Sequence, residues 1–355
     1  MLFVDDRRLL SAGAEGLRLW ELPEALGRRR KPRRLEPRSV FGTEDTFASL
    51  ARLTQGVVES LFLAGTAEGS VRALALGEAG GLLGPSVRLA ARGSPHRDDV
   101  ESLAAFPPGA RYLAAAACQD RVHLLQLGEG LALRAIAAAQ LPSRAATVAV
   151  AGAGRWLLAG VASRKVGGGL GDLGNAVVFE LTEVDTAHRA WPRLIRRDPL
   201  GIGELRSCLE RPADLLAGTQ EGNLRPLAWT EAPTPQEDPL RPAPPWTVPG
   251  ERSLGSAVLR AAHSGPVRAL VRLHDGRILS LSGLAQGQRA PNRSPVSELR
   301  LWSPRGDHLA GGEAPGPTRR DGFGLALSPS GERFAVALEG GDGFCGVEVY
   351  GVPPP

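Results

Sequence analysis

Residues 11–20 read SAGAEGLRLW, residues 64–76 read AGTAEGSVRALAL and residues 217–229 read AGTQEGNLRPLAW. In each stretch, small and apolar residues lead into a Glu-Gly pair, after which apolar residues alternate with other residues. Glycine accepts the positive φ that a tight hairpin needs, and alternation is typical of a β-strand. Each stretch therefore predicts a strand, a turn and a second strand.

Weaker copies of the same unit occur along the rest of the chain. LAAAACQDRVHLLQL, residues 113–127, has Gln119-Asp120 at the turn. A preceding strand is predicted in HRDDVESLAAF from His96 and in HSGPVRALVRL from His263. FGLALSPSGERFAVAL from Phe323 adds a first strand, a polar turn and a second strand. Together these segments predict a four-stranded meander that recurs roughly every ~50 residues, which is typical of a repeat architecture.

The segments LRLWEL around Trp20 and LRLWSP around Trp302 are similar to the Trp-Asp ending of WD40 repeats. The resemblance covers nearly the whole chain and implies an all-β fold, a β-propeller of about seven four-stranded blades in one domain over residues 1–355. The seventh blade shows only three strands, the third of which lies in GVEVYGVPPP, residues 346–355. The expected blades start near these residues: 1, 44, 96, 144, 199, 262 and 319.

The resemblance also implies a hydrogen-bond network within a blade. In WD40 proteins, a His at the start of a blade joins a strand Ser or Thr, a turn Asp and the Trp. Here His263, Ser282 and Trp302 are similar to part of this network, and no turn Asp is present. We therefore expect these three residues, together with Trp20, to have a structural role.

Composition favours a compact protein made without export. The chain has 355 residues, of which 43% are hydrophobic and 23% charged, so it can bury a core. The N-terminus has no apolar leader segment, and a turn at residues 152–155 interrupts the most apolar stretch; we expect a cytoplasmic protein with no membrane span. The basic residues are Arg except for Lys31 and Lys165, a bias typical of GC-rich genomes, and we expect a bacterial origin.

The cysteines and histidines predict neither disulfides nor metal sites. Cys118, Cys208 and Cys345 are far apart in the sequence, so we expect buried free thiols. The six histidines lie in different predicted segments without the spacing of metal ligands.

Catalytic and nucleotide-binding motifs give no site either. Residues 169–174, GLGDLG, match a dinucleotide-binding pattern, but a predicted strand follows them where that motif needs a helix. The sequence therefore predicts no catalytic residue, no cofactor and no metal.

Two kinds of loop are candidates for binding. Residues 164–175, 284–297 and 339–346 lengthen turns that we expect on one rim of the propeller, where partner proteins can bind; the alternative is that they are decorations without function. The second kind is a basic run between predicted strands. Its six charged residues are Arg28, Arg29, Arg30, Lys31, Arg33 and Arg34.

The basic run accounts for the positive charge of the chain. Without its six charges the net charge would fall from +4 to −2, so the rest of the protein is nearly neutral. Such a run can bind an acidic protein or nucleic acid, although no aromatic residues are interleaved for base stacking, and most such runs are merely solvated.

The leading hypothesis is a non-catalytic scaffold that binds other proteins through its rim loops, as a subunit of a bacterial multi-protein assembly. One alternative is a propeller enzyme or small-ligand-binding propeller that uses the central channel. A second is a nucleic-acid-binding accessory protein that uses residues 28–34. The three-stranded last blade adds one further option, in which another chain supplies the missing strand by β-augmentation.

Overall fold

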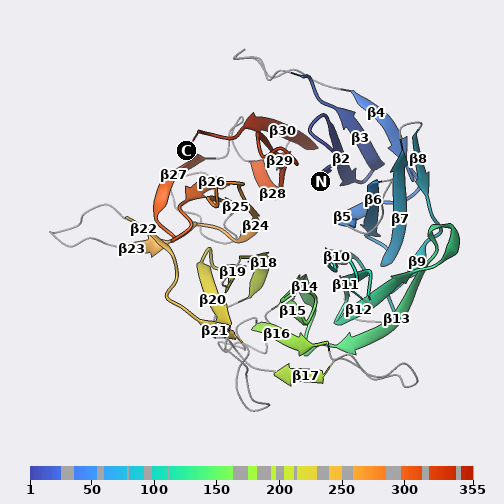
Figure 1. Cartoon of the computed structure of the whole chain (residues 1–355), viewed down its shortest axis with the longest axis horizontal. Coiled ribbons are helices and arrows are strands. Elements are labelled where there is room, and N and C mark those ends of the chain that lie inside the picture. Colours follow the sequence, from blue (N-terminus) through green and yellow to red (C-terminus); the bar gives the residue numbers. More distant parts are fainter. Residues whose placement is uncertain are drawn as a thin grey trace. The chain divides into compact units, whose positions relative to one another are not determined.

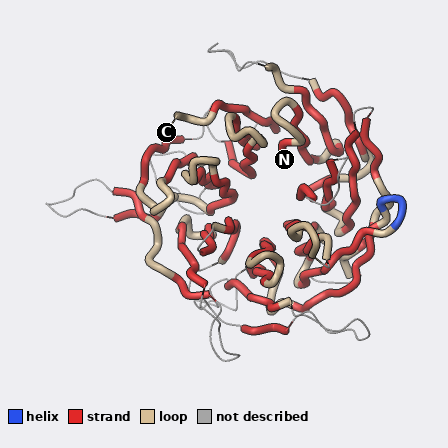
Figure 2. Tube along the Cα trace, viewed as in Figure 1, coloured by secondary structure: helices blue, strands red, loops and turns tan. Residues whose placement is uncertain are grey.

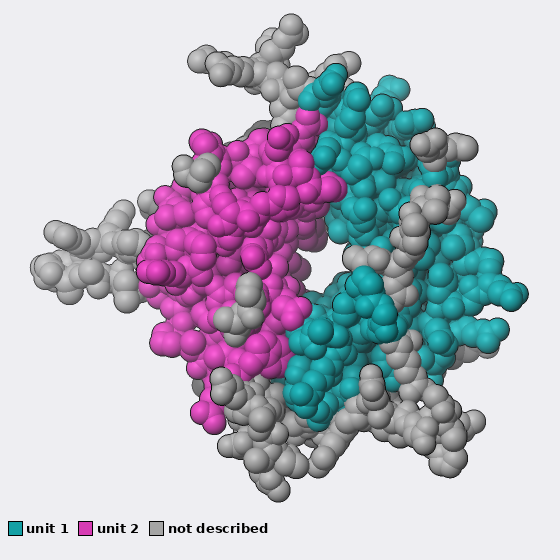
Figure 3. Space-filling view, viewed as in Figure 1, with its two compact units in different colours: residues 1–198 teal, residues 199–355 magenta. Residues whose placement is uncertain are grey.

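The computed structural model describes these residues of the chain: 1–24, 36–53, 60–77, 80–91, 98–110, 112–162, 175–181, 193–196, 204–211, 214–229, 240–249, 259–284, 297–313, 320–340 and 345–354. They form strands and one short 3-10 helix, Glu129–Leu131 (η1) (Figure 2). The chain divides into two compact units, Met1–Asp198 and Pro199–Pro355 (Figure 3). No helix among the described residues is long and apolar enough to cross a membrane.

The first unit contains four antiparallel blades, in which the strands are hydrogen-bonded in chain order (Figure 1). The first blade is β1 (Leu2–Phe3), β2 (Arg8–Gly13), β3 (Gly16–Glu21) and β4 (Pro37–Phe41). The second is β5 (Phe47–Leu53), β6 (Ser60–Thr66), β7 (Ser70–Gly77) and β8 (Gly80–Leu83), and β9 (Val87–Arg88) also pairs with β7. The third is β10 (Val100–Ala105), β11 (Ala114–Cys118), β12 (Arg121–Leu127) and β13 (Leu133–Gln140). The fourth is β14 (Ala145–Ala151), β15 (Trp156–Val161), β16 (Asn175–Glu180) and β17 (Arg193–Arg196).

The second unit contains three blades and a two-stranded ribbon. The fifth blade is β18 (Leu205–Glu210), β19 (Asp214–Thr219), β20 (Leu224–Trp229) and β21 (Leu240–Pro242). The ribbon pairs β22 (Thr247–Pro249) with β23 (Leu259–Ala261). The sixth blade is β24 (Val267–Arg272), β25 (Ile278–Ser282), β26 (Glu298–Trp302) and β27 (His308–Glu313). The seventh is β28 (Arg320–Leu327), β29 (Arg333–Gly340) and β30 (Cys345–Gly351).

These sheets confirm the predicted fold class, an all-β propeller of seven blades in which the last has three strands. The turns predicted at Gln119-Asp120 and at residues 152–155 are also present. The ribbon of β22 and β23 was not predicted. The assignment of residues 1–355 to one domain stays a prediction, because each unit is described by itself.

The recurring A-G-T-x-E-G segment has a physical explanation in each of its parts. Gly69 and Gly222 in the turns have φ of +79° and +82°, and a Cβ at Gly222 would lie 2.2 Å from the carbonyl oxygen of His263. The hydroxyl of Thr66 accepts a hydrogen bond of 3.1 Å from the backbone N–H of Ser70, the residue that starts the next strand. The segment therefore closes the hairpin and leaves room for the chain that enters the next blade.

The first glycine of the same segment makes space between blades. A Cβ at Gly218 would lie 2.3 Å from Ser207 Oγ and 2.6 Å from Val267 Cγ1. Gly65 stands in the same relation to Ser49 and Val100 in the first unit. Any side chain at this glycine would thus clash with side chains on the first strand of the same blade and on the first strand of the next blade.

The core of each unit lies between consecutive blades. The second strand of a blade is covered on both faces, so its residues are apolar in sequence rather than alternating; Ala114–Cys118 is buried throughout. In the second unit, the cluster between the fifth and sixth blades includes Trp246 and Trp302. Strands covered on both faces give continuous apolar runs. This explains why LAAAAC, residues 113–118, is still a second strand although its sequence differs from the stronger copies of the repeat.

Several predicted binding segments lie outside the described residues. The basic run Arg28, Arg29, Arg30, Lys31, Arg33 and Arg34 lies within residues 25–35, between β3 and β4. Most of 164–175 and 284–297, the centre of 339–346, and the GLGDLG match are likewise not described.

Candidate functional site

A β-bulge recurs in the first strand of six blades, from the second to the seventh. In each case the pairing with the second strand skips one residue of the first strand, as between Val267 and Ala269 in β24. A bulge leaves one residue outside the ladder and changes the direction of its side chain, and such positions are common next to functional sites. Each of these six blades therefore presents one side chain at an equivalent position of its first strand.

The skipped residues differ in chemistry between the two units. In the first unit they are Ala48, Glu101 and Ala146. In the second unit they are Arg206, Arg268 and Phe323, and we call these three residues the bulge row. The bulge row thus combines cationic and aromatic side chains on the first strands of three consecutive blades.

The strands that carry the bulge row are fixed to one another. Ser207, the residue after Arg206, donates a hydrogen bond of 2.9 Å from its Oγ to the carbonyl oxygen of Val267 in β24. Ser297 accepts a hydrogen bond of 2.7 Å from the backbone N–H of Gly322 in β28. A rigid backbone therefore positions the bulge row.

Phe323 and Arg268 lie together on the surface. Phe323 is 46% exposed, which is unusual for a large apolar side chain on a first strand. The Cζ of Arg268 is 5.7 Å from the centroid of the Phe323 ring, within range of a cation–π interaction. A bound molecule could thus make an apolar contact with Phe323 and a cationic contact with Arg268 next to each other.

Arg268 is only partly neutralised by its surroundings. A Cβ at Gly283 would lie 2.8 Å from both Arg268 Nε and Asp321 Oδ1, so this glycine leaves room for the two groups. Burial lowers the pKa of Arg268, the carboxylate of Asp321 opposes this shift, and the charge of Arg206 adds to it. The Nε atom is buried and has no hydrogen-bond partner among the described residues. A buried donor without an acceptor is costly, but because this Nε is buried, a bound carboxylate would have to contact the terminal nitrogens of the Arg268 guanidinium instead.

Arg206, in contrast, is well satisfied. Its Nε donates a hydrogen bond of 2.7 Å to Gln220 Oε1, and it forms an ion pair with Glu204. Arg206 is therefore already paired within the protein, whereas Arg268 and Phe323 are the residues that can contact a ligand.

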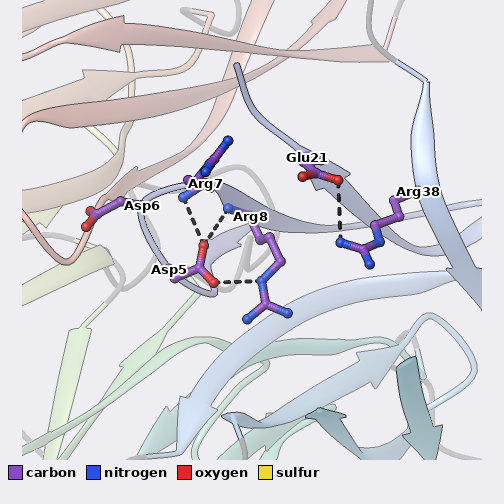
Figure 4. A pocket seen from close by; sticks show the side chains of 6 residues that line it. All are labelled: Asp5, Asp6, Arg7, Arg8, Glu21 and Arg38. Carbon is purple, nitrogen blue, oxygen red and sulfur yellow. Dashed lines mark hydrogen bonds and ion pairs between the residues drawn. The ribbon is translucent and has the colours of Figure 1, made fainter. Parts of the chain in front are cut away.

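A second candidate is a charged pocket in the first blade, between the β1–β2 turn and the ends of β3 and β4 (Figure 4). It has a volume of about 470 Å³ and is lined by Asp5, Asp6, Arg7, Arg8, Glu21 and Arg38. Its walls carry equal numbers of acidic and basic side chains. The pocket has no excess charge to select an ionic ligand.

Most of the charges in this pocket are engaged with one another. Asp5 accepts hydrogen bonds from Arg7 N, Arg8 N and Arg8 Nε at 2.9, 2.8 and 2.6 Å. Burial raises the pKa of Asp5, but these hydrogen bonds outweigh it and lower the pKa. Glu21 and Arg38 form an exposed pair at 3.4 Å. The pocket is therefore a weaker candidate than the bulge row.

The predicted network in the sixth blade is present with a different serine. Ser280 Oγ is 2.6 Å from His263 Nε2 and accepts a hydrogen bond of 2.8 Å from Trp302 Nε1. Ser282 instead accepts a hydrogen bond of 2.9 Å from the backbone N–H of Glu298. The prediction of Ser282 in the network was wrong, because Ser282 lies two residues, or roughly 7 Å, further along the strand.

The acid of the network is supplied by Glu298, which the sequence did not identify. Its Oε2 is 3.2 Å from His263 Nδ1 and accepts a hydrogen bond of 3.0 Å from Ser264 N. Burial raises the pKa of Glu298, but the hydrogen bonds from His263 and Ser264 and the charge of Arg300 lower it to about 2. Burial lowers the pKa of His263, so the ring is neutral. Its Nδ1–H then donates to Glu298, while its Nε2 accepts from Ser280.

Trp20 forms the equivalent pair in the first blade, where its Nε1 donates a hydrogen bond of 2.8 Å to Ser11 Oγ.

Cys118 and Cys208 are free thiols, and burial raises the pKa of each to about 12. No group of three or more His, Cys, Asp or Glu that could hold a metal ion occurs in the described part of the chain.

Comparison with solved structures identifies the fold. A chain of the mitotic checkpoint complex crystal structure aligns with 97% of this chain and 86% of its own length, with a TM-score of 0.57 and 14% identity. Chaetomium thermophilum Sqt1 aligns with 97% of this chain and 79% of its own length, with a TM-score of 0.59 and 14% identity. The fold shared with these structures is the seven-bladed β-propeller. No protein-family model and no curated protein sequence matches the chain.

Proposed function

We propose that the protein is a non-catalytic scaffold for protein–protein interaction, and that the bulge row is a site where a partner binds. The observation that carries the proposal is the exposed ring of Phe323, whose centroid lies 5.7 Å from Cζ of Arg268. These two side chains match a segment that offers an apolar side chain next to a carboxylate. Aromatic residues and arginine are the residue types that most often dominate interface energy.

The fold supports the same function. One neighbour in the comparison is a chain of a mitotic checkpoint complex, so this fold occurs within a multi-protein assembly. We propose that the present chain is likewise a subunit of an assembly, in a bacterium as its arginine bias suggests. We propose that the loops 164–175, 284–297 and 339–346 are further segments through which partners bind.

The test is a comparison of two variants in quantitative co-purification. The variant Arg268→Ala/Phe323→Ala removes the bulge row contacts, and Glu101→Ala alters the equivalent position in the first unit as a control. We expect the partner captured by the wild-type chain to be retained by Glu101→Ala and reduced at least tenfold by the double variant, since each hot-spot contact is worth about 1–2 kcal/mol. Equal capture by both variants would show that the bulge row is not the site.

Nucleic-acid binding through residues 28–34 stays a prediction, since these residues are not described. It requires an affinity that falls steeply with salt, because neutralised phosphates release their counterions. An affinity that is independent of salt, or that survives replacement of all six basic residues, would contradict it.

A further inference from the structure

The seventh blade offers an unpaired strand edge. Its strand order is β28, β29 and β30, whereas each of the other six blades has a fourth strand on the outer side of its third. Among the described residues, β30 has no neighbour on the side away from β29. A strand edge of this kind is a template for pairing with another chain.

The direction of the backbone groups of β30 follows from its ladder. Val352 N donates a hydrogen bond of 2.8 Å to the carbonyl oxygen of Glu332, on the side of β29, and β29 pairs with β30 without a register shift. Because hydrogen bonding alternates along an antiparallel strand, Val347, Val349 and Gly351 direct their N–H and C=O groups away from β29. Three consecutive pairing positions are thus presented on the outer edge.

The segment after β30 does not occupy this edge. The guanidinium of Arg277, in the turn between β24 and β25, donates hydrogen bonds of 2.7 and 3.0 Å to the carbonyl oxygens of Pro353 and Pro354. Arg277 is in turn held by Asp275 at 2.6 Å. Residues 352–354 are therefore fixed to the sixth blade, and this contact also anchors β30.

The first blade shows which fourth strand suits a third strand that carries a glutamate. In the first blade, Arg38 of β4 pairs with Glu21 of β3 at 3.4 Å. The third strand of the seventh blade carries Glu348, whose carboxylate accepts a hydrogen bond from Tyr350 Oη. A basic residue on an antiparallel neighbour would complement it.

We propose that the edge of β30 binds an extended segment of a partner protein, which adds an antiparallel strand with a basic residue near Glu348 and completes the seventh blade. This site is distinct from the bulge row, because Phe323 lies on β28 at the other edge of the same sheet. The two strands are two ladder steps apart, roughly 10 Å. Either site can therefore fail without the other.

The probe for this site is a labelled synthetic peptide with the sequence EPRSVFGT, which copies residues 36–43 and thus a fourth strand that already pairs with a glutamate-bearing third strand. Binding is measured by fluorescence anisotropy against the full-length chain. We expect Val349→Pro, which removes an outward N–H but no ladder bond to β29, to weaken binding at least tenfold. Val349→Thr keeps that N–H and should bind like the wild type.

A second variant keeps the test decisive if Val349→Pro lowers the melting temperature strongly. Glu348→Lys should weaken binding of this peptide about tenfold, and a peptide in which its arginine is replaced by glutamate should restore it. Arg268→Ala/Phe323→Ala should bind the peptide like the wild type, which separates this site from the proposed function. No binding to the wild-type chain, or equal binding to Val349→Pro, would overturn the proposal. A wild-type dimer that Val349→Pro abolishes would also overturn it, since a second copy would then occupy the edge.

Discussion

The first and sixth blades contain the same tryptophan–serine pair in the same register, but only the sixth blade surrounds it with buried polar groups. Leu9 lies opposite Trp20 and Ser11 opposite Arg18, just as Ile278 lies opposite Trp302 and Ser280 opposite Arg300. Trp302 is fully buried, between Trp246 at 5.6 Å and His308 at 5.3 Å, whereas Trp20 is half-buried. The pair thus belongs to the repeat, and its surroundings determine how much stability it provides.

The sheet of the sixth blade contains both the hydrogen-bond network and one residue of the proposed binding site. His263, Ser280, Glu298 and Trp302 are turned into the blade, while Arg268 stands at the bulge of β24 with its guanidinium against Phe323. The first blade has no such bulge in its described strands. Substitutions in the network should therefore change the free energy of unfolding, and those in the bulge row should change partner affinity.

The largest expected effect is that of the buried tryptophan. Trp302→Ala should lower the free energy of unfolding by about 3 to 5 kcal/mol, as large truncations in a core do. Trp20→Ala should cost about half as much, because its side chain is already half-exposed. Denaturant unfolding of both variants measures the difference. An unchanged unfolding midpoint for Trp302→Ala would refute the structural role.

The next effect is a dependence of stability on pH through Glu298. Its pKa is about 2 in the folded chain, against an ordinary value of 4.5, so the unfolded chain takes up the proton first. The stabilisation is complete above about pH 4.5 and is lost as the pH falls towards 2, by up to about 3 kcal/mol at roughly 1.4 kcal/mol per pH unit. Glu298→Gln should flatten the pH profile of stability in this window. A variant profile parallel to that of the wild type would contradict the assignment.

A smaller effect distinguishes the two serines of β25. Ser280→Ala leaves Trp302 Nε1 and His263 Nε2 without their partner and should cost about 2 kcal/mol. Ser282→Ala removes one hydrogen bond to Glu298 N and should cost about 1 kcal/mol. Ser11→Ala in the first blade should resemble Ser282→Ala. A larger loss of stability in Ser282→Ala than in Ser280→Ala would restore the network as the sequence predicted it.

The smallest effect on stability is expected from the bulge row itself. Arg268→Ala/Phe323→Ala loses a cation–π contact worth about 0.5 to 1 kcal/mol, and it also removes a buried donor without a partner. We therefore expect a change in unfolding free energy of less than about 1 kcal/mol. A change of several kcal/mol would mean that the bulge row serves the fold.

The sequence was sufficient to predict the blades because turn glycines and buried second strands are local signals. Gly16, Gly69 and Gly222 are each in the positive-φ region, and their neighbours in the sequence were enough to identify the turn. The serine of the network was misassigned for a different reason. Residues 283–297 separate β25 from β26, so the register across the hairpin could not be counted.

The bulge row was missed because a bulge interrupts the alternation on which strand prediction relies. One local signal was present, since the apolar residues that begin these strands are three apart, as in Val100 and Leu103 or Val267 and Leu270. That spacing marks an extra residue, but not which blades lie side by side. The meeting of Arg268 and Phe323 depends on packing between the sixth and seventh blades, which no local pattern specifies.

Site-specific photocrosslinking tests the central claim most directly. A benzoyl-phenylalanine is placed at position 323 in the bulge row, or at position 48, which is the exposed bulge of the second blade. Irradiation in cells should join the partner protein to the chain labelled at position 323 and give no such product at position 48. A product at position 48 alone, or none at position 323 while the partner still co-purifies, would contradict a binding site at the bulge row.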